Sequence, residues 1–181
     1  MALIELIKRR KSVRRFLDTP VEREKLIMCL EAARAAPSAC NSQPWRFIIV
    51  DDPEVKNRLC EQAFRGIYFI NAFCKQAPVI VVIVSEKGKF LARIGGMFRG
   101  TRYYLVDIGI AGEHFVLQAE ELGLGTCWIG WFKESAVKKV LNIPREKKID
   151  VLIALGYYDK KKVRSTHGRE PLDKIASFNA Y

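Results

Sequence analysis

Basic side chains gather around one hydroxyl group near the start of the chain. Residues 9–16 read RRKSVRRF, so five of the eight are basic and Ser12 lies among them. In an extended chain Arg10, Ser12 and Arg14 point to the same side, and forked guanidinium donors match the oxygens of a phosphate monoester. The same run could form a solvated arm, or a contact with nucleic acid or an acidic membrane surface.

A second polar stretch, PSACNSQPW at residues 37–45, separates an expected helix from an expected strand. Its small residues leave backbone N–H groups open to a flat ligand. Asn41 and Gln43 each offer a donor and an acceptor, which suits the edge of a heterocycle that carries C=O and N–H groups. A simple turn, with Trp45 filling the core, is the alternative.

Other motifs that could carry chemistry are excluded. The stretch GLGTCWIG lacks the glycine that a dinucleotide fingerprint needs at Trp128, and no P-loop or nucleophile elbow occurs. Glu113 and His114 are neighbours on an expected helix and so point to different faces, which does not favour a catalytic pair. We therefore predict no acid–base catalytic side chain.

The composition indicates one ordinary globular domain, residues 1–181. Hydrophobic residues make up 49% and charged residues 28% of the chain, and the formal net charge is +11. Five cysteines without a C-x-x-C pair, and only two histidines, make a metal site improbable. The longest apolar run, residues 77–84, is too short to span a membrane. We expect a cytoplasmic protein with an affinity for anions.

Hydrophobic periodicity predicts helices and strands that intermingle without regular alternation, which is typical of the α+β class. Thr19 and Glu22 have the capping-box spacing, so a helix is expected to begin at Pro20 and to stop before Pro37. A helix at 103–122 is apolar nearly all round, and must be buried in the fold or against another subunit. The other expected elements are helices near 3–7, from 53 and at 134–141, strands at 46–50, 78–85 and 149–158, a loop or short strand near 123–132, a surface excursion at 86–102, and a tail at 159–181 that is basic and then amphipathic.

Four stretches in this order resemble one family. They are RRKSVRRF, PSACNSQPWRF, ELGLGTCWIGWF, and ALGYY followed by GREPLDKI. Together they resemble the FMN-dependent nitroreductases, in the small subgroup without large insertions. The resemblance implies a mainly antiparallel sheet flanked by helices, and an intertwined homodimer with two FMN sites at its interface. The tail at about 159–181 would contact the partner subunit.

The resemblance also implies where the cofactor binds, position by position. The flavin phosphate would be held by Arg10, Lys11, Ser12, Arg14 and Arg169. Pro37, Ser38 and Ala39 of one protomer would pack against the ring, with Asn41 and Gln43 nearby, and Asn71 would bond its pyrimidine edge. The backbone of Trp128, Ile129 and Gly130 would lie over the ring, with the Gly130 N–H facing the hydride-accepting nitrogen.

Two positions depart from the family pattern. Many relatives carry glutamate where Gly130 stands, and most carry lysine where Glu170 stands. A backbone contact at Gly130 survives that change, whereas a side-chain role does not. The glutamate at position 170 weakens the expected phosphate site at its tail end.

The reaction that the resemblance implies is ping-pong electron transfer in two successive steps. NADH or NADPH reduces the FMN and leaves, and a small acceptor such as a nitroaromatic or a quinone then takes the electrons in the same pocket. Alternatives are another flavin-dependent redox role, such as dehalogenation or flavin breakdown, and a basic nucleic-acid-binding protein. The split of basic residues between the chain ends, without a nucleic-acid motif, argues against the last.

Overall fold

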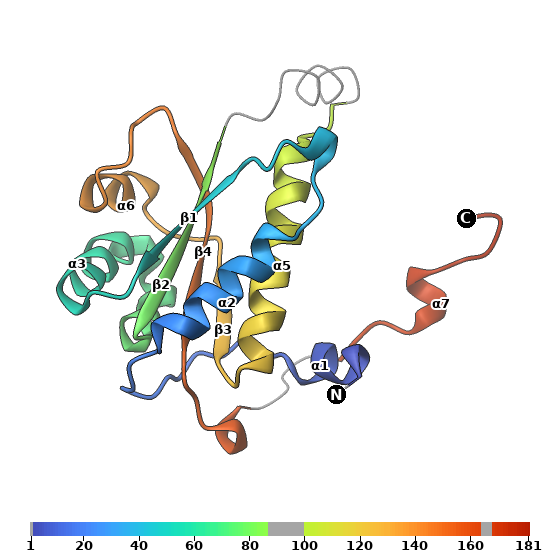
Figure 1. Ribbon diagram of the computed structural model, residues 1–181, viewed down its shortest axis with the longest axis horizontal. Helices are drawn as coiled ribbons and strands as arrows, with labels where there is room; N and C mark the ends of the chain where they lie inside the picture. The colour runs from blue at the N-terminus through green and yellow to red at the C-terminus, as the bar shows by residue number, and fades with distance from the viewer. Residues whose placement is uncertain (1, 87–99, 164–167) are drawn as a thin grey trace.

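An antiparallel sheet forms the centre of the molecule. The computed structural model describes residues 2–86, 100–163 and 168–181. Strands β1 (Trp45–Val50), β2 (Val79–Ser85), β3 (Gly125–Ile129) and β4 (Lys148–Gly156) lie in the order β1-β2-β4-β3 (Figure 1). Each neighbouring pair in that order is antiparallel. The expected α+β class with an antiparallel sheet is confirmed.

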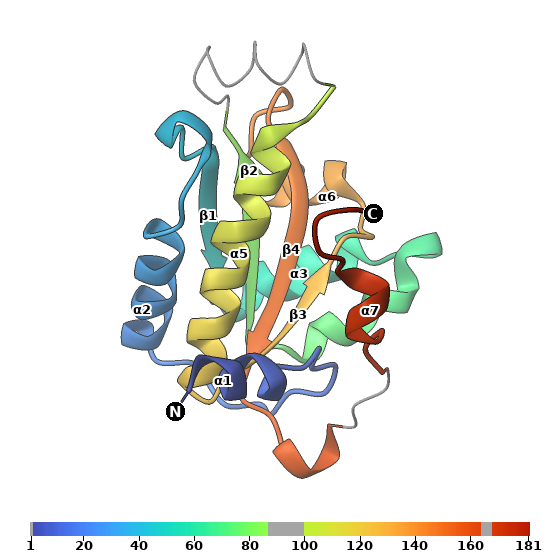
Figure 2. The same cartoon turned by 90° about the vertical axis from the view of Figure 1, so that its right-hand side faces the viewer.

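Helices cover both faces of this sheet (Figures 1 and 2). The long helix α5 (Tyr103–Glu121) and its neighbour α2 (Arg23–Arg34) cover one face, and α3 (Pro53–Ala63), η2 (Gly66–Gln76) and α6 (Glu134–Val140) cover the other. The short helix α1 (Leu3–Arg9) contacts α5. The remaining elements are η1 (Ala39–Asn41), η3 (Lys160–Lys162) and α7 (Leu172–Ile175). Residues 87–99 of the expected surface excursion lie outside the described residues.

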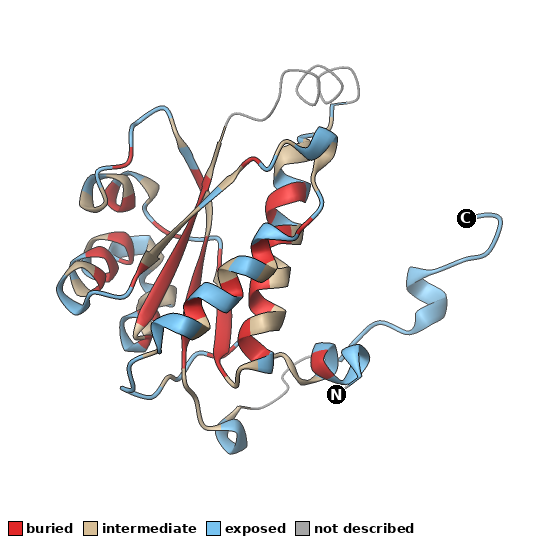
Figure 3. Ribbon diagram, in the orientation of Figure 1, coloured by how far each residue is buried: buried red, intermediate tan, exposed pale blue. Residues whose placement is uncertain are grey.

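Strand β2 shows why the sheet is buried on both sides. Successive side chains of a strand point to opposite faces, and every hydrophobic residue of β2 is at most 2% exposed (Figure 3). Alternate residues join the two cores: one set packs with α3 and α6, the other with α2 and α5. The first set is Ile80, Val82 and Val84, and the second is Val79, Val81 and Ile83. The continuous apolar run is therefore a central strand, as predicted.

The predicted start of the second helix is wrong. Helix α2 begins at Arg23, and Glu22 is its N-cap residue without a side-chain capping bond. The Glu22 carboxylate instead accepts hydrogen bonds from the Tyr157 hydroxyl (2.6 Å) and from Lys25 Nζ (3.3 Å). Tyr157 directly follows the last residue of β4. Because the Glu22 carboxylate is bonded to this tyrosine, the chain before Glu22 stays extended and no capping box forms.

Both ends of the chain carry apolar side chains that the single protomer does not bury. In α1 only Leu6 is buried, whereas Leu3 and Ile4 are 65% and 54% exposed. The tail runs away from the sheet and its helices (Figure 1), and its side chains Leu172 and Phe178 are 74% and 92% exposed. These large apolar side chains are left exposed by the described part of the chain, and an exposed apolar patch of this kind marks a contact surface.

Candidate functional site

The basic loop that follows α1 runs in extended form along the edge strand β3. The backbone N–H of Val13 donates to the Thr126 carbonyl (2.8 Å), and the Val13 side chain is fully buried. Because side chains alternate in an extended segment, the neighbours Ser12 and Arg14 are exposed. The local conformation is the one that the alternating pattern predicts.

Two guanidinium groups of this loop face the first half of β3. Burial raises the pKa of the Cys127 thiol, and the positive charges of Arg14 and Arg10 partly oppose that rise. Arg10 Nε also lies 3.8 Å from the Glu113 carboxylate on α5. The result is a positive potential beside an open strand edge, the kind of field that holds an anion.

The outer edge of β3 presents backbone N–H groups. The Thr126 carbonyl points outward, since it accepts from Val13, while β4 pairs along the other edge. Because backbone groups of alternate residues in a strand point to the same edge, the N–H group of Trp128 faces outward too, and Gly130 directly follows the strand. A Cβ built on Gly130 would meet no atom within 4 Å. Ligand atoms can therefore approach this backbone closely.

Helix α5 fixes the side chain of Trp128. A Cβ on Gly112 of α5 would lie 2.3 Å from Trp128 Cη2, so only glycine leaves room for the indole there. Ile129, the next residue along, is 2% exposed and points into the opposite core. The Trp128 and Ile129 side chains therefore pack on opposite faces of the sheet, and neither covers the outer edge of β3.

Asn71 lies next to the loop that follows β3. Its Nδ2 donates to the Trp131 carbonyl (2.8 Å), and Trp131 Nε1 donates to the Ile67 carbonyl (3.0 Å). The rings of Tyr68 and Trp131 are 5.2 Å apart. The structure thus brings Asn71 to the β3 end of the candidate site, although it is distant in sequence.

The polar stretch before β1 forms a tight structure of its own. The Ser38 Oγ accepts from the Gln43 N–H (3.0 Å), and Gln43 Nε2 donates to the Asn41 side chain (3.1 Å). Cys40, Asn41 and Gln43 have φ angles of 53°, 49° and 45°, in the left-handed region that non-glycine residues seldom adopt. The Ala39 N–H donates to Asp107 Oδ1 (3.0 Å), which attaches the stretch to α5. Pro37, beside Ser38, is exposed.

The two halves of the predicted site lie at opposite ends of α5 within one protomer. Asp107, near the start of α5, contacts Ala39, whereas Glu120, near its end, contacts Arg9. Thirteen residues separate these carboxylates, or about 20 Å along a helix. Figure 1 shows the same separation, with α1 at the far end of α5 from the stretch before β1. Ala39 and Arg9 therefore contact opposite ends of α5.

Among the described residues, neither Arg169 nor Lys11 has a side-chain hydrogen bond or ion pair that fixes its position. Arg169 is exposed at the base of the tail, where the following Glu170 pairs with Lys174 at 3.3 Å. Lys11 is partly buried beside Ser12. Their roles toward a phosphate stay predictions.

Sequence reasoning missed the group that anchors the basic loop. Glu120 is 1% exposed, and its carboxylate accepts from Arg9 Nε (2.7 Å) while its carbonyl accepts from Arg9 Nη2 (2.8 Å). The Tyr158 hydroxyl lies 3.3 Å from the same carboxylate. Burial, with the Glu120 charge, raises the pKa of Tyr158 to about 12, so its hydroxyl stays protonated and donates. A charged residue in an apolar helix was the available signal.

The side chains that the sequence did not favour for chemistry have ordinary partners. His114 Nδ1 lies 3.2 Å from the Ala32 carbonyl on α2, away from the Arg10 contact of Glu113. Four of the five cysteines are buried and none forms a disulfide. Across the described residues no His, Cys, Asp and Glu cluster could hold a metal ion. None of the helices there combines the length and hydropathy of a bilayer-spanning segment.

Fold and site together define an α+β protein with a cationic loop beside an open, donor-rich strand edge. Residues 7–68 and 62–157 match the model of the Nitroreductase family. An iodotyrosine deiodinase of Thermotoga neapolitana is 31% identical over 180 residues, covering 88% of this chain and 90% of that relative. A putative NADH dehydrogenase/NAD(P)H nitroreductase of Methanothermobacter thermautotrophicus is 30% identical, covering 87% of this chain and 78% of that relative.

Solved structures agree with the sequence relatives. A nitroreductase family protein from Clostridium novyi NT is 34% identical with a TM-score of 0.76, and 90% of each chain is covered. An FMN-dependent nitroreductase from Clostridium difficile R20291 is 31% identical with a TM-score of 0.77, covering 98% of this chain and 99% of the other. The chain therefore belongs to the nitroreductase family. The names of its relatives are those of oxidoreductases, which supports an oxidoreductase activity here.

Proposed function

We propose that this protein is an FMN-dependent oxidoreductase that takes electrons from NADH or NADPH and passes them to a small acceptor. The observation that carries the proposal is the open edge of β3, where the outward Trp128 N–H group and the uncrowded Gly130 lie beside the cationic loop. A phosphate-bearing planar cofactor needs both features. Membership of the nitroreductase family supports the same assignment.

The donor set of this chain fits FMN. Arg10, Ser12 and Arg14 offer forked and hydroxyl donors for a phosphate monoester, with Lys11 and Arg169 as further cations. The space at Gly130 admits a ring against the backbone. Bound FMN would supply the two-electron redox chemistry, and the protein supplies binding, position and electrostatics.

The residues of this chain have separate tasks in that function. The loop cations hold the phosphate, and the N–H groups of Trp128 and Gly130 stabilise negative charge at the ring edge. A well-aimed donor of this kind is worth roughly 3 kcal/mol in other enzymes. Asn71 offers its amide to the pyrimidine edge by exchanging its bond to the Trp131 carbonyl.

A homodimer completes the proposed site. The stretch with Pro37, Ser38, Ala39, Asn41 and Gln43 is attached to the start of α5 through Asp107, whereas the cationic loop contacts its middle and end through Glu113 and Glu120; a second copy would bring this stretch to the ring bound by the first. The exposed apolar side chains of α1 and of the tail at 159–181 offer the surface for such a pairing. We expect a particle of twice 20.7 kDa.

Flavin content tests the proposal directly. The purified protein should show flavin absorption that is released on denaturation, and it should oxidise NADH or NADPH steadily when a nitroaromatic or a quinone is added. Arg10→Ala with Arg14→Ala should lose FMN while the far-ultraviolet circular dichroism is kept. A protein that refuses excess FMN, or that shifts DNA with a steep salt dependence, would refute it.

Dehalogenation is a second candidate for the acceptor reaction. The iodotyrosine deiodinase of Thermotoga neapolitana is 31% identical, with 90% of its length covered, whereas the nitroreductase relative is 30% identical, with 78% of its length covered. A comparison of iodotyrosine with a nitroaromatic and a quinone, at equal concentration on the chemically reduced protein, separates the branches. Iodide release faster than reduction of the other two acceptors would select dehalogenation.

A further inference from the structure

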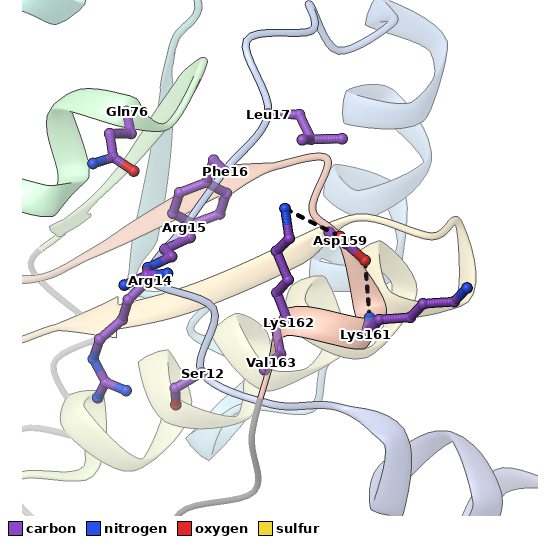
Figure 4. Close-up of a pocket in the computed structure, with 10 residues that line it drawn as sticks. All are labelled: Ser12, Arg14, Arg15, Phe16, Leu17, Gln76, Asp159, Lys161, Lys162 and Val163. Carbon is purple, nitrogen blue, oxygen red and sulfur yellow. Dashed lines mark hydrogen bonds and ion pairs between the residues drawn. The ribbon is translucent and has the colours of Figure 1, made fainter.

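A groove extends from the cationic loop to the end of the sheet. Its volume is about 1180 Å³, above the ~300–1,000 Å³ of most small-molecule pockets. Ser12 and residues 14–17 line one wall, and Asp159 and residues 161–163 line the other (Figure 4). The Leu17 N–H donates to the Tyr157 carbonyl (2.8 Å), which ties the two walls together at one end. Only Ser12 and Arg14 of its lining belong to the proposed FMN site, so most of the groove has no role there.

The charge of this groove suits an anion with more than one negative charge. The cations Arg14 and Arg15 line one wall and Lys161 and Lys162 the other, and among the described lining residues the one acidic side chain is Asp159. That carboxylate is already neutralised, because it accepts from the Lys161 N–H (3.0 Å) and pairs with Lys162 Nζ (3.6 Å). The lining therefore keeps a positive excess.

An aromatic side chain lies among these cations. Phe16 is half-buried in the groove, and its ring rests against β4 at Gly156, where a Cβ would come within 3.3 Å of Phe16 Cδ1. Leu17 extends the same apolar surface and is 47% exposed. An aromatic ring that packs against the sheet on one face, and lines a groove with the other, can stack with a nucleobase.

We propose that this groove binds a nucleoside diphosphate. The base stacks on Phe16, and Arg15 and Lys162 hold the diphosphate, since paired cations match its oxygens. This inference deepens the proposed function and rests on it in one respect. Because the proposed electron donor is NADH or NADPH, the nucleoside diphosphate is the adenosine-diphosphate half of that dinucleotide. Ser12 and Arg14, which are assigned to the FMN phosphate, also line this groove, so the groove adjoins the proposed flavin site.

Calorimetric titration of the FMN-loaded protein with ADP, at low ionic strength, tests the groove without turnover. Arg15→Ala should raise the Kd for ADP about tenfold, the loss expected of one charge-assisted contact. Lys162→Ala should raise it at least as much, because the Asp159 carboxylate is released as well. Phe16→Leu should weaken ADP about fivefold or more, and leave inorganic pyrophosphate unchanged.

Lys160→Ala is the matched control, since this neighbouring lysine of η3 does not line the groove. It should leave the Kd for ADP within twofold of wild type. Unchanged ADP binding in Arg15→Ala and Lys162→Ala overturns the inference, and so does equal binding of pyrophosphate and ADP, which would leave an anion site only.

Two further measurements separate this inference from the proposed function. The FMN content of all four variants should equal that of the wild type, because none of these residues is assigned to the flavin. The KM for NADH or NADPH should rise in Arg15→Ala and Lys162→Ala with kcat retained. A wild-type protein that binds ADP through Arg15 yet oxidises neither dinucleotide contradicts the donor assignment and supports the nucleotide site.

Discussion

At the scale of single residues, buried charges determine where the functional loop sits. Glu120 is held inside the apolar end of α5 by Arg9 and Tyr158. An ionised carboxylate is stable there only because it is paired and hydrogen-bonded. The pair fixes the last residue of α1, and the cationic loop begins at the next residue. The position of the proposed phosphate ligands thus depends on a side chain that contacts no ligand.

Replacing Glu120 by glutamine should therefore destabilise the protein. The Arg9 guanidinium loses its counter-charge, and we expect the unfolding free energy to fall by about 2 kcal/mol, less than for a fully buried pair because Arg9 is 36% exposed. Urea denaturation followed by circular dichroism measures the change. Glu121→Gln, one position along and exposed, should change it by less than about 0.5 kcal/mol. Equal effects of both substitutions would contradict the anchoring role.

Sequence patterns predicted these residues unevenly, for a physical reason. Alternation revealed that Ser12 and Arg14 are exposed around a buried Val13, because strand periodicity is local. The roles of Asp107 and Glu120 depend on Ala39 and Arg9, which are far away in the chain. No local pattern reports such partners.

At the scale of elements, hydrophobic periodicity predicted the type of a helix or strand from the residues within it. It failed to predict boundaries that depend on contacts with another segment. Strand β2 and helix α5 follow from their apolar patterns. The start of α2 does not, because Tyr157 takes the Glu22 carboxylate that a capping box would need. The loop or short strand near 123–132 is the edge strand β3, which became recognisable only by its pairing with β4.

The contact of α5 with β3 gives a paired test at two glycines of one helix. Gly112→Ala places a methyl group 2.3 Å from the Trp128 ring, and we expect a loss of about 1–3 kcal/mol from overpacking. Gly109→Ala, one turn earlier, meets no atom within 4 Å and should stabilise the helix by up to about 1 kcal/mol. Urea denaturation of both variants checks the signs. If Gly112→Ala is neutral, Trp128 does not pack as described.

The attachment of α6 to β4 should make stability depend on pH in acid. Burial opposes ionisation of Glu134, but hydrogen bonds from Lys138 (2.8 Å), Lys148 and the Ile149 N–H (3.0 Å) prevail and lower its pKa to about 2. A carboxyl group with a depressed pKa stabilises the fold above its unfolded pKa of about 4.3. That contribution, roughly 3 kcal/mol at most, is lost as the pH falls from about 4.5 to about 2.

Denaturation midpoints between pH 6 and pH 2 measure this effect. Glu134→Gln should flatten the acid limb, since the substituted residue has no proton to gain. Glu146→Gln, an exposed acid near the same strand, should leave the limb as in the wild type. An unchanged slope in Glu134→Gln would mean that other carboxyl groups carry the acid sensitivity.

At the scale of the whole molecule, the residues predicted to hold FMN are distributed along the helix α5. Asp107 at the start of α5 holds the stretch around Ala39, Gly112 in its middle packs against Trp128 of β3, and Glu120 at its end binds Arg9 beside the cationic loop. Residue patterns predicted these groups of residues, whereas their positions along α5 follow only from contacts between residues that are distant in the sequence. In the proposed dimer each site takes its halves from different chains, and this arrangement can be tested by mixing two defective variants.

One variant carries Arg10→Ala and Arg14→Ala, and the other carries Ala39→Trp, which fills the surface expected to pack on the ring. Each variant alone should retain little FMN. In a mixed dimer, isolated with two affinity tags, one site receives both defects and the other receives none. The mixed dimer should therefore bind about one FMN per two chains, with wild-type affinity, because binding at an intact site is unaffected by the other. If both halves came from one chain, every site in the mixed dimer would be defective, and flavin absorption would stay as low as in the parents.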